Sequence, residues 1–263
     1  MKLTIIGGGN MGGAIARGLV TCGTFAAADI TLAGPHQNVL DKVAASAPGI
    51  VTMTDNGAAI KGADVIILAV KPWVLPGVLE EIAPRIAFRE QSIVSLAAGI
   101  SLADIDGMLH RYSSDRTLFR AMPNTAMSVG CSMTFLCHDG ASQQSVDDVV
   151  AIFDRLGSTA VIEERLMGAA TALCSCGIAY VMRYVRAATE GAVELGLYPD
   201  KAHDYMLATM KGAVALLEAT GNNPEVEIDK VTTPGGITIK GLNAMEAHGF
   251  TTSVIEGLKA SAK

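Results

Sequence analysis

A glycine-rich turn near the start of the chain has the composition of a dinucleotide-binding site. Residues 7–12 read Gly-Gly-Gly-Asn-Met-Gly and match the pattern G-x-G-x-x-G. Gly7 permits a tight turn, Gly9 lets the backbone approach a pyrophosphate, and Gly12 lets a helix pack closely on a strand. Free N–H groups at the start of that helix bind the negative pyrophosphate without a basic side chain. The turn therefore predicts a dinucleotide cofactor.

The end of the second predicted strand bears on which dinucleotide is bound. An NAD-specific site has Asp or Glu about 20 residues beyond the glycines, where the carboxylate binds the ribose 2′-hydroxyl. This chain has Ala33-Gly34-Pro35-His36 there. The missing carboxylate leaves space for a 2′-phosphate, although the Arg that is typical of NADP sites is also missing. His36 could donate to that phosphate or lie exposed at a helix start. We expect NADPH to be preferred, with NADH also possible.

A second segment with residues suited to chemistry lies near the other end of the chain. Thr233-Pro234-Gly235-Gly236 predicts a helix start, with Thr233 as N-cap and Pro234 as first helical residue. Backbone N–H groups at such a start bind anions, although an ordinary capped helix has the same residues. Thr238 would lie one turn inside this helix. Its hydroxyl would reach a group bound at the helix start or bond a carbonyl of its own helix.

The elements that must position these segments fall into two regions. Up to about residue 162, short β-branched runs alternate with helix-length stretches, which predicts an α/β domain with a mostly parallel sheet covered on both faces. Residues 65–70 are apolar without alternation, so this strand should be central and buried on both faces. The predicted strands are residues 2–6, 30–33, 50–53, 64–70, 92–96, 117–122, a strand or pair of strands at 129–136, and 159–162. The rest of the chain reads as helix, which predicts an all-helical second domain.

Composition and charge exclude several classes of protein. Of 263 residues, 50% are hydrophobic and 17% are charged, and the net charge is −6. Disordered, coiled-coil and collagen-like chains are excluded by this composition, and the negative charge argues against nucleic acid as a partner. The five cysteines have no metal-ligand spacing, and the first residues lack a signal-peptide core. We expect a cytoplasmic protein with reduced thiols and no metal site.

An uncharged run between Arg165 and Arg183 approaches the length of a membrane span. Glycine and hydroxyl residues dilute it, so we predict a helix buried inside a protein and no membrane partner. A helical region of about a hundred residues is too small to cover such a helix alone. The run therefore predicts a homodimer.

Five segments of the chain carry the motifs of one known family. The most specific is residues 229–246, Asp-Lys-Val-Thr-Thr-Pro-Gly-Gly-Ile-Thr-Ile-Lys-Gly-Leu-Asn-Ala-Met-Glu. The others are residues 5–12, residues 64–72 ending in Ala-Val-Lys-Pro, Ser-Leu-Ala-Ala-Gly at 95–99 and Arg-Ala-Met-Pro-Asn-Thr at 120–125. In this order they resemble the pyrroline-5-carboxylate reductases, and the resemblance spans essentially the whole chain.

The resemblance implies a fold and an activity. The fold would be a Rossmann domain over residues 1–162 and a helical domain over residues 163–263 that binds substrate and interlocks with a partner subunit, in a dimer or a higher assembly of dimers. The activity would be NAD(P)H-dependent reduction of the cyclic imine 1-pyrroline-5-carboxylate to L-proline, the last step of proline biosynthesis. The small-molecule substrate carries a carboxylate, which the predicted anion site at Thr233 would hold.

The resemblance also implies roles for individual residues. The pyrophosphate would be held by Gly7, Gly9, Asn10, Met11 and Gly12. The adenosine ribose would contact Asn56, and the nicotinamide half would lie along Ala69, Lys71, Pro72, Ala97 and Ala98. The substrate would face Thr233, Gly235, Gly236, the backbone of Ile237 and Thr238. Thr238 would act catalytically by orienting the imine nitrogen and relaying a proton to it, with water as the alternative proton source.

The chain departs from the family pattern at three places. The family has a polar basic cluster where this chain has residues 33–36, and its Ser-Gly-Ser-Gly-Pro-Ala-Tyr run reads Cys-Ser-Cys-Gly-Ile-Ala-Tyr at 174–180. Ile237 stands where Thr or Ala is commoner. The alternative functions are reduction of a related imine, a 3-hydroxyacid dehydrogenase and a non-catalytic NADP-binding sensor. The dehydrogenases have a catalytic Lys followed four residues later by Asn, and no lysine of this chain has that spacing.

Overall fold

Eight strands form one mostly parallel sheet in the first part of the chain. The structure, a computed structural model, describes residues 1–262. The strand order is β3-β2-β1-β4-β5-β6-β7-β8, and the one antiparallel pairing joins β6 and β7. The strands are β1 (Leu3–Ile6), β2 (Ile30–Ala33), β3 (Val51–Met53), β4 (Val65–Leu68), β5 (Ser92–Ser95), β6 (Thr117–Met122), β7 (Ser132–His138) and β8 (Gly157–Val161). The predicted α/β class is confirmed.

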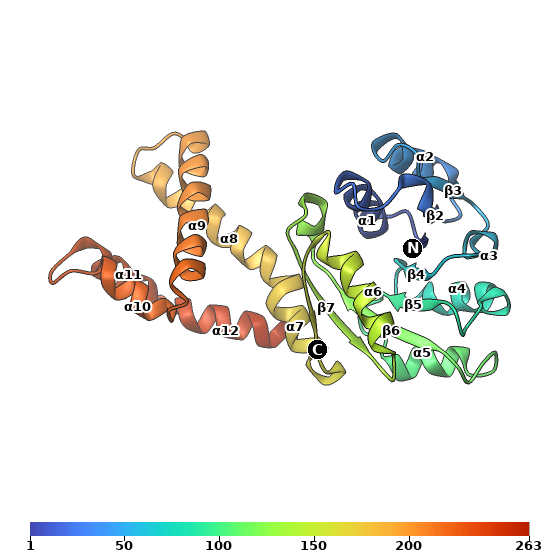
Figure 1. Cartoon of the computed structure of the whole chain (residues 1–263). Helices are drawn as coiled ribbons and strands as arrows, with labels where there is room; N and C mark the ends of the chain where they lie inside the picture. The colour runs from blue at the N-terminus through green and yellow to red at the C-terminus, as the bar shows by residue number, and fades with distance from the viewer. Residues whose placement is uncertain (263) are drawn as a thin grey trace. The chain divides into compact units, whose positions relative to one another are not determined.

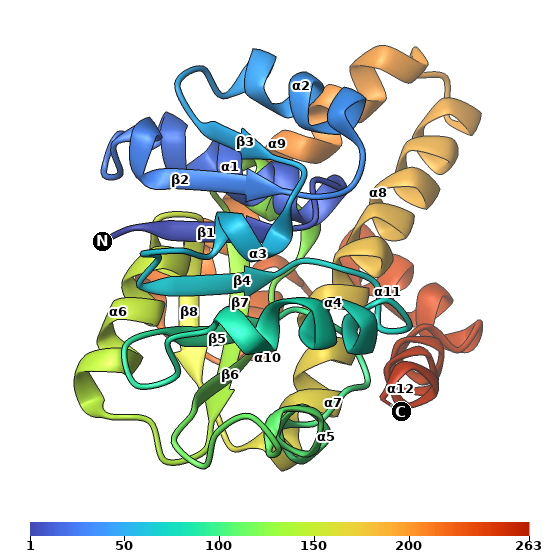
Figure 2. The same cartoon turned by 90° about the vertical axis from the view of Figure 1, so that its right-hand side faces the viewer.

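Helices cover both faces of this sheet (Figure 2). One face packs against α1 (Asn10–Thr21), α2 (Gln37–Ser46) and α6 (Gln143–Asp154). The other face packs against α3 (Asn56–Ala59), α4 (Leu75–Ile82) and α5 (Leu102–Leu109), which lie in front of the sheet in Figure 2. Short 3-10 turns are η1 (Ala27–Asp29), η2 (Ala83–Arg85), η3 (Thr125–Val129) and η4 (Glu164–Leu166).

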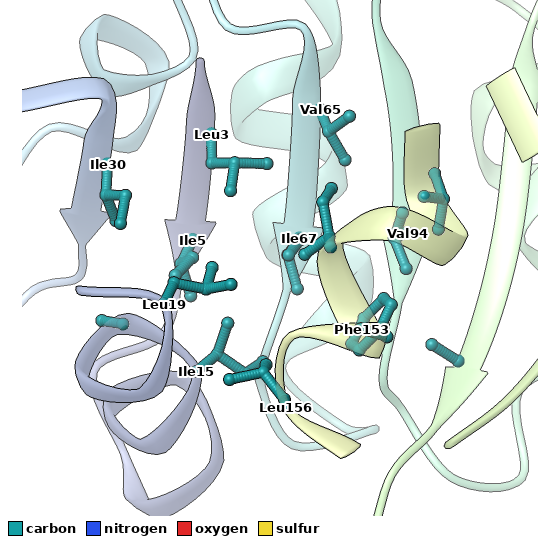
Figure 3. Close-up of a cluster of buried hydrophobic side chains, with 14 of the residues drawn as sticks. Leu3, Ile5, Ile15, Leu19, Ile30, Val65, Ile67, Val94, Phe153 and Leu156 are labelled. Carbon is teal, nitrogen blue, oxygen red and sulfur yellow. The ribbon is translucent and has the colours of Figure 1, made fainter. Parts of the chain in front are cut away.

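The side chains of β4 alternate between two hydrophobic cores. Val65 and Ile67 join the core beneath α1 and α6 (Figure 3), whereas Ile66 and Leu68 join the core beneath α4 and α5. All four side chains are buried, because a parallel sheet with helices on both faces leaves no side of a central strand in water. The prediction that this strand is central is confirmed.

The structure corrects the predicted strand at residues 129–136. Residues 125–129 form the 3-10 turn η3, and the strand β7 begins only at Ser132. The side chain of Asn124 accepts a hydrogen bond from the backbone N–H of Ala126 at 3.0 Å. Gly130 adopts the left-handed conformation, with φ of 70°. These two features close the turn and keep residues 129–131 out of the sheet.

The chain divides into two compact units, residues 1–175 and a second unit that begins at Cys176. The second unit is helical, as predicted. Its helices are α8 (Gly177–Glu194), α9 (Pro199–Thr220), α10 (Pro224–Val231), α11 (Ile237–Ala247) and α12 (Phe250–Ser261), drawn in yellow to red in Figure 1. We predicted a domain boundary after residue 162, which is earlier in the chain than the division between these two compact units. That domain boundary stays a prediction.

The uncharged run does not form one regular helix. A π-helical turn, η5 (Thr171–Cys176), lies between α7 (Met167–Ala170) and α8. Among the described residues, the stretch Glu164–Glu194 is long and apolar enough to span a membrane by length and composition alone. Only 17% of its most apolar window is buried. The predicted burial inside the protein is therefore not achieved within one chain.

Candidate active site

A cleft of about 700 Å³ lies at the carboxyl ends of the parallel strands. Most of its lining residues lie at or after the ends of β1, β2, β4, β5 and β6, and Ser175 comes from later in the chain. β1 pairs with β2 on one side and with β4 on the other, so the direction in which successive strands are added reverses beside β1. A crevice at such a reversal, outside the carboxyl ends of the strands, is the usual ligand site of an open parallel sheet.

The glycines of the turn after β1 differ in what surrounds them. Gly7 has a φ of 111°, and a Cβ there would overlap the carbonyl oxygen of Ala69. A Cβ on Gly12 would overlap the carbonyl oxygen of Gly7. A Cβ on Gly9 would meet no atom within 4 Å, although Gly9 lines the cleft. Gly7 and Gly12 therefore allow close packing, whereas Gly9 leaves free space in front of the backbone.

The start of α1 offers unpaired backbone donors to this free space. Gly9 is the N-cap, its residue type supplies no capping side chain, and the first turn contains no acidic residue. The first intrahelical bond runs from the N–H of Gly13 to the carbonyl of Gly9 at 2.8 Å. The N–H groups of Asn10, Met11 and Gly12 thus have no helical partner. The arrangement fits a pyrophosphate, because these donors and the positive end of the helix face an open cradle.

The β2 end of the cleft carries no carboxylate. Its lining residues are Gly34, Pro35, His36, Val39 and Leu40. His36 is exposed and is the N-cap of α2, but its side chain makes no capping hydrogen bond. The first turn of α2 contains no acidic residue. This end therefore lacks the group that would select a 2′-hydroxyl, as the sequence predicted.

The end of the cleft beyond β1 is mostly apolar. It is lined by Ala69, Val70, Lys71, Pro72, Val74, Leu96, Ala98, Met122, Pro123 and Ser175. Lys71 is exposed and pairs with no carboxylate within the part of the chain that the structure describes. A flat apolar ring with few polar groups fits this lining.

Nine of the residues assigned to the cofactor line the cleft, and three do not. Those in the lining are Gly7, Gly9, Asn10, Met11, His36, Ala69, Lys71, Pro72 and Ala98. Gly12 is buried beneath the turn, and Ala97 is 3% exposed in the core under α4 and α5. Asn56 is 7% exposed and donates to Glu81 at 2.9 Å, while its Oδ1 has no partner among the described residues. Its contact with a ribose stays a prediction.

Sequence reasoning missed several lining residues. Gly34, Val39 and Leu40 come after β2, and Met122 and Pro123 lie at the end of β6, so their positions at strand ends are the signal that would have identified them. Ser175 comes from η5, far along the chain, and no sequence signal places it here.

Burial raises the pKa of the neighbouring Cys174 thiol, so this thiol stays protonated and unreactive at neutral pH.

The predicted substrate segment lies in the second unit, and its helix starts later than we expected. Thr233 is not the N-cap, because residues 233–236 form a turn in which the N–H of Gly236 donates to the Thr233 carbonyl at 2.8 Å. Gly235 has a φ of 72°, which no α-helix accepts. The helix α11 therefore begins at Ile237, with Gly236 as its N-cap.

This correction moves Thr238 to the second residue of α11. Thr233, Gly235 and Thr238 are exposed, and Ile237 is 87% exposed. No side chain caps this helix, so its first N–H groups are free to bind an anion. The Thr238 hydroxyl is then beside these donors and not one turn deeper. Their roles in binding substrate stay predictions.

Comparisons with known proteins match both units. A family model described as pyrroline-5-carboxylate reductase dimerisation matches residues 164–263, and one described as NADP oxidoreductase, coenzyme F420-dependent, matches residues 2–99. A crystal structure of Plasmodium falciparum pyrroline carboxylate reductase with NADP bound has a TM-score of 0.89 and 26% identity, covering 100% of this chain and 95% of that one.

Curated relatives are similar over the whole chain. Pyrroline-5-carboxylate reductase 2 of Dictyostelium discoideum is 34% identical over 100% of this chain and 91% of its own length. Pyrroline-5-carboxylate reductase 1 of the same organism is 35% identical over 98% of this chain, which spans only 48% of that longer protein. With the sheet, the glycine-rich cradle and the helical second unit all in place, the chain belongs to the pyrroline-5-carboxylate reductase family of oxidoreductases.

Proposed function

We propose that this protein reduces 1-pyrroline-5-carboxylate to L-proline with NAD(P)H, the last step of proline biosynthesis. The observation that carries the proposal is the open cradle at Gly9, where uncapped N–H groups of α1 face a cleft at the reversal point of the sheet. Family membership supplies the substrate. A 3-hydroxyacid dehydrogenase is disfavoured because no lysine of the chain has Asn four residues later, and a sensor without turnover would show no oxidation of cofactor.

Each part of the chain has a task in this reaction. When bound in the cleft, NAD(P)H would supply the hydride that reduces the imine carbon, and a proton added to the imine nitrogen would complete the secondary amine of proline. The N–H groups of Asn10 and Met11 hold the pyrophosphate, and the apolar residues beyond β1 keep water from the ring. The uncapped start of α11 holds the substrate carboxylate. The Thr238 hydroxyl orients the imine nitrogen and relays its proton.

We further propose that NADPH is the preferred cofactor. The support is the lack of a carboxylate at the β2 end of the cleft and the exposed His36 beside the free N–H groups of α2. These donors suit a 2′-phosphate. Comparing kcat/KM for the two cofactors tests this choice, and an equal or higher value with NADH would reject it.

We further propose that the protein forms a homodimer or an assembly of dimers. We also propose that it is located in the cytoplasm. The support for association is the poorly buried second unit, together with the match to a dimerisation family. The support for the location is that the five cysteines are free thiols in the structure, as in a reducing compartment.

Thr238→Ala tests the assigned chemistry. Loss of NADPH absorbance is followed with and without the imine. We expect kcat to fall about 10-fold, or ~1.4 kcal/mol, with little change in KM, because the hydroxyl acts when the nitrogen gains its proton. Thr238→Ser keeps the hydroxyl and should retain most of the rate. An unchanged kcat in Thr238→Ala would assign the proton to water. If the unaltered protein oxidises no cofactor when the imine is added, the proposed function is rejected.

A further inference from the structure

Ser175 enters the cofactor cleft from a segment distant in sequence from the other lining residues. It belongs to the π-helical turn η5, and its neighbour Cys174 accepts a hydrogen bond at its carbonyl from Nδ2 of Asn124 at 3.3 Å. Asn124 directly follows Pro123, which lines the cleft after β6. Ser175 is therefore held at the β6 end of the cleft, opposite the β2 end that contains His36.

The orientation of the Asn124 amide is set by its own contacts. The side chain is buried, and its Oδ1 accepts from the backbone N–H of Ala126 at 3.0 Å. Because Oδ1 is committed to a donor, the amide NH₂ must face the Cys174 carbonyl. The backbone N–H of Asn124 donates to Oγ of Ser132 at 3.1 Å, which anchors the loop to β7. A rigid contact thus positions the residue next to Ser175.

Ser175 is chemically distinct at its end of the cleft. The lining residues at the ends of β5 and β6 are Leu96, Ala98, Met122 and Pro123, which have apolar side chains. Ser175 is half-buried, and within residues 1–262 its hydroxyl makes no hydrogen bond that would occupy it. Beyond β1, only Lys71 offers another polar side chain, and it is exposed. A free hydroxyl beside an apolar slot suits a flat ring with one amide substituent.

We propose that the Ser175 hydroxyl hydrogen-bonds the carboxamide of the nicotinamide ring and so sets the rotation of the ring in the cleft. The inference rests on the proposed function, in which the β2 end takes the adenosine half and leaves the β6 end to the nicotinamide. A carboxamide has both a donor and an acceptor, and a hydroxyl serves either. The family run quoted above has Gly at this position, so the contact is a feature of this chain and not of the family pattern.

Binding measurements on Ser175→Ala test the contact. Trp73 is the single tryptophan of the chain, is 76% exposed and lies in sequence between the lining residues Pro72 and Val74, so its fluorescence is measured as NADPH is added. Adenosine 2′,5′-bisphosphate, which has no nicotinamide, is measured by competition with NADPH. We expect Ser175→Ala to raise the Kd of NADPH about fivefold, or ~1 kcal/mol, and to leave the Kd of the fragment unchanged.

Three further variants give the test its controls. Ser175→Thr retains the hydroxyl and should restore much of the NADPH affinity, whereas Ser175→Gly should match Ser175→Ala. His36→Ala should weaken NADPH and the fragment together, because it changes the adenosine end. A change in NADPH affinity of less than about twofold in Ser175→Ala, which is under ~0.4 kcal/mol, would overturn the inference. Equal weakening of the fragment would also overturn it, since Ser175 would then support the whole cleft.

Asn124→Asp tests whether Asn124 supports NADPH binding by positioning Ser175. Aspartate keeps an acceptor for the Ala126 N–H but loses the donor to the Cys174 carbonyl. We expect weaker NADPH binding in the single variant and no further weakening when Asn124→Asp is added to Ser175→Ala, because the two residues serve one contact. Additive effects would remove the positioning role from Asn124. If the unaltered protein binds neither NADPH nor NADH, the proposed function itself fails, and this result is distinct from the failure of Ser175 alone.

Discussion

The two compact units differ in how much of their apolar surface one chain can bury. In the first unit, two clusters of buried side chains fill both faces of the sheet, and Phe119, Phe153 and Ile15 are almost fully inaccessible. Among residues 176–262, only Gly177, Val185 and Ala202 are buried. Met182, Tyr198 and Ile237 are 61%, 79% and 87% exposed. The first unit has a complete core of its own, whereas the second has none.

The difference shows where stability must come from in each unit. A sheet layered between helices excludes water from both faces within one chain. The helices α8 and α9 instead enclose a groove of about 1090 Å³, lined mainly by apolar residues such as Val181, Met182 and Leu207. A groove lined by exposed apolar side chains needs another surface to cover it, and a second copy of the chain is the partner that the family match indicates.

The largest expected effect is on assembly, through Leu207→Asp. Leu207 lines the groove and is 40% exposed in one chain. A carboxylate placed in an interface that another chain covers costs several kcal/mol when unpaired, so we expect loss of the oligomer and partial loss of helix. Light scattering and circular dichroism measure both. Ala208→Asp, the exposed next residue outside the groove, should change the mass less. An intact oligomer in Leu207→Asp would show that this groove is not an interface.

The next largest effect concerns the core of the first unit. Phe153 on α6 is 0% exposed and packs with Ile15 and Leu156 (Figure 3). Phe153→Ala should lower the free energy of unfolding by about 3–5 kcal/mol through lost burial and a cavity. Denaturant unfolding at several protein concentrations should give the same loss each time, while the oligomer persists. A loss that varies with protein concentration would mean that this core also depends on the partner chain.

A smaller effect, confined to binding, is expected for Gly9→Ala. The φ of Gly9 is −67° and a Cβ there meets no atom, so stability should stay within about 0.5 kcal/mol. The methyl group occupies the space in front of the α1 donors, and we expect the Kd of NADPH to rise at least about 10-fold, or ~1.4 kcal/mol. Gly12→Ala should instead destabilise the unit, because its Cβ overlaps the Gly7 carbonyl oxygen. Equal thermal shifts in the two variants would contradict this distinction.

The smallest expected effect is a pH-dependent loss at the start of α5. Ser101 and Asp104 form a capping box, with Asp104 Oδ2 accepting from the Ser101 N–H at 2.8 Å. Hydrogen bonds from the Ser101 side chain and then its backbone hold the pKa of Asp104 below its ordinary value of 3.8. A lowered folded-state pKa stabilises the protein above pH 3.8 and loses this contribution as the pH falls through the folded-state value.

Ser101→Ala tests this expectation. The substitution removes the Ser101 hydroxyl from Asp104, so it should lower the free energy of unfolding at neutral pH, and the difference from the unaltered protein should shrink once the pH falls below about 4. Urea unfolding at pH 7 and at lower pH values checks this expectation. A difference that grows on acidification would have the wrong sign and would assign the stabilisation to another group.

Local signals in the sequence were sufficient to predict much of the secondary structure of the first unit. The unbroken apolar run of β4 predicted a strand buried on both faces, and the glycine spacing predicted the turn before α1. The start of α11 was predicted wrongly, because Thr-Pro-Gly-Gly satisfies both an N-cap and a tight turn. The positive φ of Gly235 and the hydrogen bond from the N–H of Gly236 to the Thr233 carbonyl distinguish the two. The antiparallel direction of β7 and the π-helical turn η5 have no local signal, since the first depends on pairing with β6 and the second lies where Asn124 contacts the Cys174 carbonyl.

The sequence by itself determined the fold class, the helical nature of the second unit, the cofactor turn and the family. Residue spacing and backbone preferences act over a few neighbours, so they can be read along the chain. The tertiary structure decided which residues share the cofactor cleft. Ser175 and Met122 line it together although they are far apart in sequence, while Asn56 is turned towards Glu81. Such placements depend on how strands pair and how a helical turn is held, and these are long-range contacts that no short run of residues encodes.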